Sequence, residues 1–493
     1  MQIGFDNDKY LKTQSEHIRE RISKFGGKLY MEFGGKLFDD YHASRVLPGF
    51  HPDSKITMLK ELRNQAEVII AINANDIEKN KVRGDLGITY DMELLRLVDA
   101  FTSNGLLIGS VVLTQFAEQP SAISYENKLQ TLGLKVYRHY PIDGYPSNIP
   151  LIVSDNGFGK NDYIVTSRPL VVVTAPGPGS GKMATCLSQL YHENKRGIKA
   201  GYAKFETFPV WNLPLNHPVN LAYEAATADL DDINEIDPFH LEAYGTTVIN
   251  YNRDIAVFPV LSAIFEKIQG TSPYKSPTDM GVNMVGFCIS DDAVCQAAAK
   301  QEILRRYYTA LCEKRKGNAG DDPIMKIELL MKKCGITTGD RPCVMAANVK
   351  AEETGAPAAA MQMDDGTILT GKTSALLGAS SALLLNALKY IAGIDDKIEL
   401  LSADLISPIQ NLKVDHLGGH SSLLHLNEIL IALALASVTD PNAKKAIDQL
   451  DNLSGLEAHS SVILSQIDEG VFKKLGINLT CEPHYESKKL YHK

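Results

Sequence analysis

The sequence lacks the features that mark several classes of protein. Its seven cysteines are odd in number and form no Cys-x-x-Cys pair, which argues against a disulfide framework or a zinc ribbon and favours a reducing compartment. The N-terminus shows neither the basic nor the apolar segment of a signal peptide, and the longest apolar run, residues 429–436, is too short to cross a bilayer. We therefore expect a cytoplasmic protein.

An excess of positive charge is also missing. The net charge is -9 and the isoelectric point is about 5.8, which disfavours nucleic acid or an anionic membrane as a partner. No His-Glu-x-x-His or Gly-x-Ser-x-Gly motif is present, so nothing indicates a peptidase. With 493 residues, of which 44% are hydrophobic, the chain is typical of a soluble globular protein with roughly three domains.

The N-terminal part alternates between strand and helix patterns. Strands are predicted at 28–33, 67–73, 106–113, 135–140, 170–174 and 197–206, with helices at 10–25, 54–65, 91–101 and 121–132. This alternation predicts an α/β domain over 1–230 with a mostly parallel sheet. Recurrent prolines between 209 and 277, followed by helical patterns at 291–313 and 323–333, predict a mainly helical subdomain over 231–325.

The part from 326 to 493 returns to strand signals. We predict strands at 342–349 and 396–402, a hairpin over 358–370 that turns at Asp365-Gly366, and buried helices at 374–390 and 423–438. A hairpin followed by a buried helix resembles the core of cytidine deaminases and implies a three-layer α/β domain. Residues 374–389 contain no Cys, His or Glu, so the zinc chemistry of those enzymes is not expected. The two apolar helices could alternatively build a homo-oligomer interface.

The strongest chemical signal is the glycine-rich stretch between the strand 170–174 and the next helix. It predicts a phosphate-binding loop at 175–183, in which backbone N–H groups, a hydroxyl and an ammonium group converge; the residues concerned are Gly177, Gly179, Ser180, Gly181 and Lys182. Two positions depart from the standard P-loop, because Pro176 replaces the first glycine and Met183 replaces the magnesium-binding hydroxyl. The alternative is a tight strand-to-helix turn packed by glycines.

The segment after the loop resembles the variant P-loop enzymes dethiobiotin synthetase and CTP synthase over residues 171–229. The resemblance implies that Lys204 faces the anion and that Glu206 is a magnesium ligand, with Glu224 as a weaker second carboxylate. A nucleotide with magnesium would then be the cofactor, and a small-molecule anion or nucleotide the partner. The alternative is that these carboxylates only form a solvated edge.

A second candidate site contains histidines. His416, His420 and His425 lie close together in the sequence and could bind a metal or transfer protons in an inter-domain enzyme site at 416–428. Lys372 could join them. It also lies in residues 366–373, which match the phosphate-binding P-loop expression formally, although their context is that of a hairpin. The alternative is helix capping and ordinary hydrogen-bonded histidines.

Four stretches together resemble a bacterial family known as domain of unknown function 1846. They are residues 175–185, 204–212, 236–245 and 276–283, and the resemblance extends over nearly the whole chain. It implies an α/β protein of several subdomains with a helical insert and a deaminase-like C-terminal layer. Some members are labelled ATP-dependent peptidases, which these residues do not support. The family supplies no catalytic residues to transfer.

Overall fold

The computed structural model describes residues 2–35, 37, 38, 40–83, 87–419 and 421–486. By its internal contacts the chain divides into two compact units. The N-terminal unit comprises residues 2–223 and 232–296, and the C-terminal unit comprises 224–231 and 297–493. The domain boundaries at 230 and 325, which were drawn from composition, stay a prediction.

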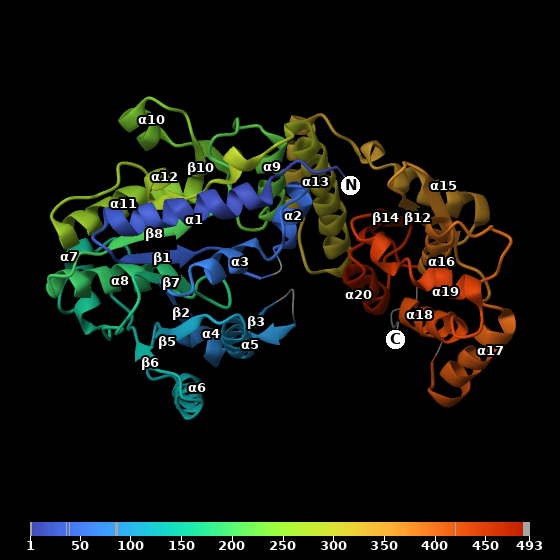
Figure 1. Cartoon of the computed structure of the whole chain (residues 1–493), viewed down its shortest axis with the longest axis horizontal. Coiled ribbons are helices and arrows are strands. Elements are labelled where there is room, and N and C mark those ends of the chain that lie inside the picture. The colour runs from blue at the N-terminus through green and yellow to red at the C-terminus, as the bar shows by residue number, and fades with distance from the viewer. Residues whose placement is uncertain (1, 36, 39, 84–86, 420, 487–493) are drawn as a thin grey trace. The chain divides into compact units, whose positions relative to one another are not determined.

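A seven-stranded parallel sheet forms the centre of the N-terminal unit (Figure 1). Its strand order is β11-β8-β1-β7-β2-β5-β6, and every neighbouring pair is parallel. The strands are β1 (Leu29–Phe33), β2 (Ala66–Asn73), β5 (Leu107–Thr114), β6 (Val136–Arg138), β7 (Leu170–Thr174), β8 (Gly201–Phe205) and β11 (Gly281–Val282). The predicted parallel sheet is confirmed, and β11, which follows the proline-rich stretch, lies at its edge.

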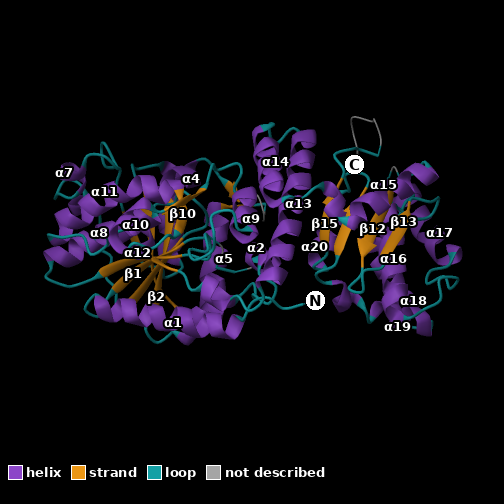
Figure 2. Ribbon diagram, turned by 90° about the horizontal axis from the view of Figure 1, so that it is seen from above, coloured by secondary structure: helices purple, strands orange, loops and turns teal. Residues whose placement is uncertain are grey.

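Helices cover this sheet on both faces, which is why β1 and β7 are buried at every position. α8 and α11 pack on one face, and α1 lies on the other (Figure 2). The helices are α1 (Asn7–Lys24), α2 (Tyr41–Val46), α3 (Ser54–Glu61), α4 (Ala74–Glu78), α5 (Tyr90–Ser103), α6 (Pro120–Thr131), α7 (Ile149–Ile152), α8 (Lys182–Lys195), α10 (Pro238–Tyr244), α11 (Asn252–Gln269) and α12 (Pro277–Met280). Two small antiparallel ribbons complete the unit, β3 (Val82–Arg83) with β4 (Ile88–Thr89) and β9 (Asn234–Ile236) with β10 (Ile249–Tyr251). Two further helices, α9 (Pro218–Ala226) and α13 (Asp292–Lys316), each contribute residues to both units.

The C-terminal unit contains a four-stranded mixed sheet of order β13-β12-β14-β15. β12 (Ala358–Gln362) is antiparallel to β13 (Ile368–Lys372) and to β14 (Glu457–Ser460), whereas β14 is parallel to β15 (Asn478–Cys481). The helices are α14 (Asp322–Cys334), α15 (Pro342–Thr354), α16 (Ala379–Ala392), α17 (Ala403–Asn411), α18 (Leu426–Ala436), α19 (Pro441–Ile447) and α20 (Gln466–Lys474).

Alternate residues of β12 face different layers. Ala360 packs against α15, whereas Ala359 and Met361 join the large apolar cluster built with α16 and α18. This two-residue period is that of a strand with helices on both of its faces. The hairpin between β12 and β13 is also present, with Gly366 at φ +87° in its turn.

Two predicted strands in this unit are wrong. Residues 342–349 belong to α15, which Pro342 opens in its first turn and which Gly355 ends in the left-handed conformation. Their short apolar run fits a strand and a buried helix equally well, and periodicity cannot separate the two. Residues 396–402 form turns before α17, where the Asp395 side chain accepts a hydrogen bond from the Lys397 N–H at 2.8 Å.

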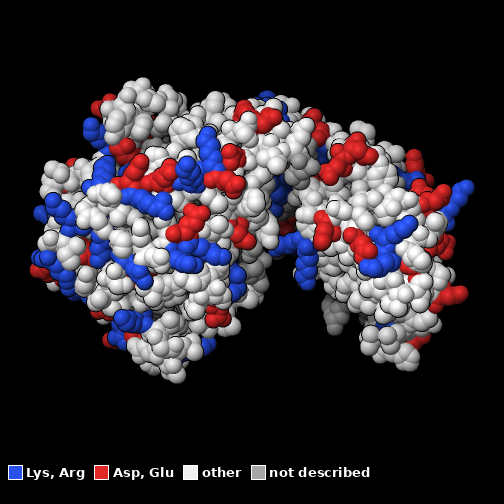
Figure 3. Space-filling model, in the orientation of Figure 1, with Lys and Arg blue, Asp and Glu red and all other residues white. Residues whose placement is uncertain are grey.

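The described residues contain no helix that is both long and apolar enough to span a bilayer. On the face shown in Figure 3, basic and acidic side chains are interspersed over the surface. This mixture agrees with the modest net negative charge of the sequence.

Candidate functional site

The loop between β7 and α8 lies at the carboxyl edge of the parallel sheet. The connection after β7 leads to β8, whereas the connection after its neighbour β2 leads to β5 on the opposite side. The edge between β7 and β2 is therefore a topological switch point, the place where α/β sheets bind their ligands. Asn73, at the end of β2, donates a hydrogen bond to the Gly179 carbonyl at 3.2 Å and so ties the loop to this edge.

Close packing explains the glycines of this loop. A Cβ on Gly177 would lie 2.3 Å from the Tyr90 hydroxyl oxygen, and Gly181 adopts φ +82° as the N-cap of α8. The buried Ser180 hydroxyl donates to the Gly177 carbonyl at 2.9 Å, while Thr114 donates to the Ser180 carbonyl at 2.8 Å. The loop is thus fixed internally, and the Ser180 hydroxyl is used within it.

The N-cap residue of α8 is Gly181, which has no side chain that could cap the helix. The N–H groups of a helical first turn lack intrahelical partners, and the helix dipole favours an anion there. Met183 packs against the apolar core, and the Thr185 hydroxyl donates back to the Gly181 carbonyl at 2.9 Å. Neither residue therefore presents the hydroxyl that a P-loop offers to magnesium.

Lys182, the first residue of α8, has one weak ionic partner. Its Nζ lies 3.9 Å from Oε1 of Glu32, near the end of β1, and it makes no hydrogen bond with the described residues. The Lys182 side chain is 15% exposed. Glu32 is held from the other side, because the Tyr202 hydroxyl donates to its Oε2 at 2.9 Å.

Lys204 is much more strongly paired than Lys182. Its ammonium contacts Glu206 at 2.8 Å and also forms an ion pair with Asp254 on α11. Burial opposes the charged form, but the carboxylates of Asp254, Glu206 and Glu32 outweigh it and raise the Lys204 pKa. The ammonium is therefore already neutralised by protein groups.

Glu206 is a buried carboxyl with an unusual pKa. Burial is the main cause that raises its pKa from 4.5 to about 7; the Asp254 carboxylate acts in the same direction, and Lys204 opposes both. The indole of Trp211 lies beside Glu206 and partly offsets this rise of its pKa, and the buried hydroxyl of Tyr251 is also near. Buried carboxyl groups with perturbed pKa values are typical of functional sites.

The predicted metal ligands are not brought into a recognisable metal centre. Among the residues that the structure describes, no group of three or more His, Cys, Asp or Glu side chains could hold a metal ion. Glu206 is engaged with Lys204, and Glu224 lies in α9 and belongs to the other compact unit.

The residues of the predicted histidine site are not linked to one another by hydrogen bonds or ion pairs in the described part of the chain. His425 is the N-cap of α18, where it forms a capping box with Glu428, and its Nδ1 lies 3.3 Å from Asp468. His416 is exposed, and no hydrogen bond or ion pair joins it to His425 in the described part of the chain. His420 lies outside the described residues. Lys372 is the exposed last residue of β13.

Sequence reasoning missed Glu32, Tyr202 and Asp254. The reason is topological: β1 lies between β7 and β8, so the Glu32 carboxylate lies between Lys182, which opens the helix after β7, and Lys204 on β8. An acidic residue near the end of a buried strand, two positions before Gly34, was the available signal for Glu32. Asp254 has no such local signal, because a helix distant in sequence supplies it.

The fold and the site define a mixed α/β protein with a glycine-rich loop at the switch point of a parallel sheet. The family model described as "Domain of unknown function DUF1846, N-terminal" matches residues 3–335, and its C-terminal counterpart matches residues 339–491. The chain therefore belongs to the DUF1846 family.

Relatives from two genera resemble the chain over its full length. A UPF0371 protein of Corynebacterium urealyticum is 59% identical over 492 residues, which cover 100% of this chain and 99% of the relative. A UPF0371 protein of Streptococcus pyogenes serotype M3 is 58% identical over 491 residues, with the same coverage. These names describe no activity.

Proposed function

We propose that the chain binds a phosphate group of a small molecule, foremost a nucleotide, at residues 175–183. The observation that carries the proposal is Lys182, which places a poorly paired, partly exposed ammonium at the uncapped N-terminus of α8. A cation beside free helical N–H groups is the basic requirement for phosphate binding. The topological switch point supplies the location at which such a ligand is expected.

Glu32 is the group with which this phosphate competes. Its carboxylate is the present partner of Lys182 at 3.9 Å, and a phosphate oxygen would approach the same ammonium at a shorter distance. Tyr202 continues to hold Glu32 after such an exchange, because its hydroxyl bonds the other carboxylate oxygen. The remaining negative charge of Glu32 lowers the affinity for anions without blocking the site.

Lys204 acts indirectly in this proposal, through its charge and without contact with the phosphate. Glu206 and Asp254 occupy its ammonium, so it does not contact the phosphate as the resemblance to dethiobiotin synthetase implied. It lies opposite Glu32 in the register of β1 and β8 and offsets part of that negative charge. Its role is to make the field at Lys182 more favourable for an anion.

The donor set does not fit a magnesium ion held by the protein. Mg²⁺ takes oxygen ligands in a near-octahedral arrangement, usually one or two carboxylates with phosphate oxygens and water. Met183 offers no hydroxyl, and the Glu206 carboxylate is taken by Lys204. A magnesium ion would have to arrive with the nucleotide, held by the phosphates and water.

Thermal stability measured with and without ligand tests the proposal. A ligand at a hundred times its Kd adds about 2.7 kcal/mol to native stability, which raises the Tm by about 5 °C in a domain of this size. ATP, ADP and inorganic phosphate are the probes. Lys182→Ala should abolish the shift, whereas Lys199→Ala, which removes an exposed charge elsewhere, should keep it. Equal behaviour of the two variants would refute the site.

We propose a second property, self-association through α18, because an apolar stripe remains exposed on it. Ile431 and Leu435 lie one turn apart with 62% and 68% exposure, and Val438, just beyond the helix, is 81% exposed. Aligned exposed apolar residues favour a contact with another surface. Leu435→Glu should lower the molecular mass found by light scattering, whereas Met345→Glu, at an exposed apolar residue of α15, should not. A monomeric native chain would contradict this proposal.

We retain the likeness of the C-terminal unit to cytidine deaminases as a proposal about fold alone. The β12–β13 hairpin is followed by α16, which packs against both of its strands. Residues 374–389 contain none of the side chains that would hold a catalytic zinc. Metal analysis of the purified protein should find no stoichiometric zinc, and one zinc per chain would contradict this view.

A further inference from the structure

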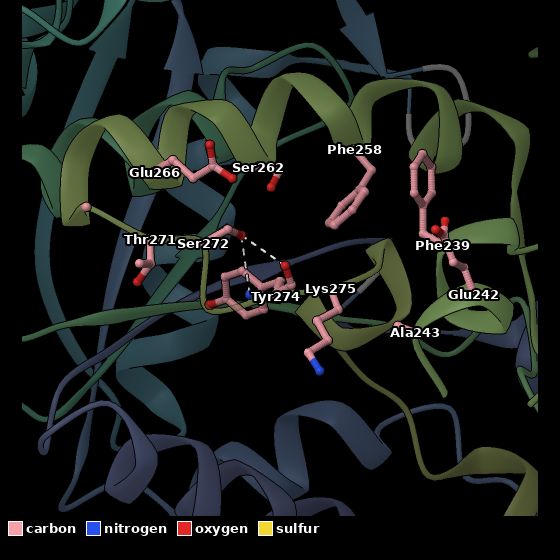
Figure 4. A pocket seen from close by; sticks show the side chains of 11 residues that line it. Phe239, Glu242, Ala243, Phe258, Ser262, Glu266, Thr271, Ser272, Tyr274 and Lys275 are labelled. Carbon is pink, nitrogen blue, oxygen red and sulfur yellow. Dashed lines mark hydrogen bonds between the residues drawn. The ribbon is translucent and has the colours of Figure 1, made fainter. Parts of the chain in front are cut away.

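A groove lies between α10, α11 and the segment 270–275 of the N-terminal unit (Figure 4). Its volume is about 730 Å³, within the range of small-molecule sites in proteins. None of its lining residues belongs to the loop at 175–183 or to the ion-paired group of Lys204, Glu206 and Asp254. The groove is therefore a candidate site separate from the proposed phosphate site.

Aromatic side chains form the apolar part of the groove. The rings of Phe239 on α10 and Phe258 on α11 lie 5.0 Å apart between centroids, and Phe258 and Tyr274 are buried. Tyr274 is fixed from behind, because its hydroxyl oxygen accepts a hydrogen bond from the Tyr202 N–H at 3.0 Å and donates to the Tyr202 carbonyl. The aromatic surface is thus preformed, which reduces the entropy lost on binding.

Two carboxylates supply the charge of the groove. Glu242 on α10 and Glu266 on α11 both line it, and neither enters an ion pair or side-chain hydrogen bond with the described residues. Lys275 also lines it, but Figure 4 shows its side chain directed away from the rings, and its Nζ lies over the Tyr244 ring at 5.5 Å from the centroid. The groove therefore presents unpaired negative charge next to aromatic faces.

We propose that this groove binds a small organic amine, with its ammonium group at Glu242 or Glu266 and its hydrocarbon body against Phe239, Phe258 and Tyr274. A cation gains from a carboxylate and from aromatic faces together, whereas an organic anion of the same shape meets repulsion from both carboxylates. Ser262, on the same face of α11 as Glu266, provides a hydroxyl that can accept a hydrogen bond from the ammonium.

Phenethylamine is the test probe, because it combines one ammonium with an aromatic body, and 3-phenylpropionate is its anionic counterpart. Isothermal titration at low ionic strength should show saturable binding of phenethylamine and at least about tenfold weaker binding of 3-phenylpropionate. Binding of the two compounds with equal affinity would overturn the proposal, because it would leave the carboxylates without a role. An absence of saturable phenethylamine binding would overturn it as well.

Variants locate the binding in the groove. Glu242→Gln combined with Glu266→Gln should weaken phenethylamine at least about tenfold, since a carboxylate-to-ammonium contact is lost. Glu235→Gln is the matched control, because it removes an exposed carboxylate of β9 that does not line the groove. Ser262→Phe should abolish binding by filling the groove without changing its charge. Unchanged affinity in the double variant and in Ser262→Phe would place the bound amine elsewhere and refute the proposal.

Discussion

Nζ of Lys182 lies 3.9 Å from Oε1 of Glu32, although the lysine opens α8 and the glutamate lies near the end of β1. The two residues are 150 positions apart and meet because β1 is the direct neighbour of β7 in the sheet. The carboxylate is thereby a weak partner of the ammonium that the glycine-rich loop offers to a ligand. The first prediction below depends on this pairing.

Removal of the Glu32 charge should strengthen anion binding. In Glu32→Gln the repulsion between the carboxylate and a bound phosphate disappears, and we expect about tenfold tighter binding of inorganic phosphate, equal to about 1.4 kcal/mol. Calorimetric titration of the variant and the native chain measures this difference. Glu16→Gln, an exposed position of α1, is the charge-matched control and should leave the Kd unchanged. Weaker binding in Glu32→Gln would show that Glu32 contacts the ligand.

The stability of the N-terminal unit should depend on pH through Glu206. Its pKa is raised from 4.5 in the unfolded chain to about 7 in the folded one. Between these values the folded chain binds more protons, so the contribution of Glu206 to stability is complete below 4.5 and is lost as the pH rises to 7.

The neutral amide of Glu206→Gln removes this dependence. From about pH 5 to pH 8, the free energy of unfolding of the variant, measured with urea, should increase by about 2 kcal/mol relative to that of the native chain. Glu61→Gln, on the exposed surface of α3, should follow the native profile. Identical pH profiles for the native chain and Glu206→Gln would contradict the raised pKa.

The loop glycines should differ in their tolerance of alanine. Gly177→Ala would place a Cβ 2.3 Å from the Tyr90 hydroxyl, so we expect a loss of about 3 kcal/mol together with weaker phosphate binding. Gly179→Ala meets no atom within 4 Å and costs only the strain of φ +76°, about 1 kcal/mol. Thermal unfolding of both variants gives the comparison. A larger loss in Gly179→Ala would contradict the packing of the loop.

Much of the fold could be predicted from the sequence, because its strongest local patterns agree with the tertiary structure. The apolar run of β2 and the β-branched run of β7 are buried on both faces and read directly as central strands. The strand predicted at 342–349 is wrong because small apolar residues suit either a strand or a helix. Packing against β12 favours the helix α15.

The candidate site could be predicted only in part. Gly177, Gly181 and Lys182 follow from local chemistry, since one loop contains them all. Glu32 lies beside Lys182, and Asp254 lies beside Lys204. Both acids come from elements distant in the chain and reach the lysines through the tertiary arrangement of the sheet and its helices. That arrangement is set by the global packing of helices on both faces, which no local pattern encodes.

Arg341 should be essential for the stability of the C-terminal unit. Its side chain is fully buried, bonds Thr480 and the carbonyls of Ala458 and Asn478 at 2.8–3.0 Å, and forms an ion pair with Glu457. Arg341→Ala removes these bonds and leaves Glu457 with Arg305 as its ionic partner, and we expect a loss of about 3 kcal/mol. Urea unfolding measures the loss.

The exposed Arg315 of the same unit is the control for Arg341. Arg315→Ala should cost less than about 1 kcal/mol, because exposed charges contribute little to stability. Similar losses in the two variants would contradict the structural role assigned to the buried guanidinium.

Titration of inorganic phosphate into the native chain, Lys182→Ala and Lys199→Ala, followed by ³¹P NMR, tests the phosphate-binding proposal most directly. Phosphate needs the ammonium at the head of α8, so saturable binding should occur in the native chain and in Lys199→Ala and should be lost in Lys182→Ala. Saturable binding that persists in Lys182→Ala, or no binding in the native chain, would contradict a phosphate site at residues 175–183.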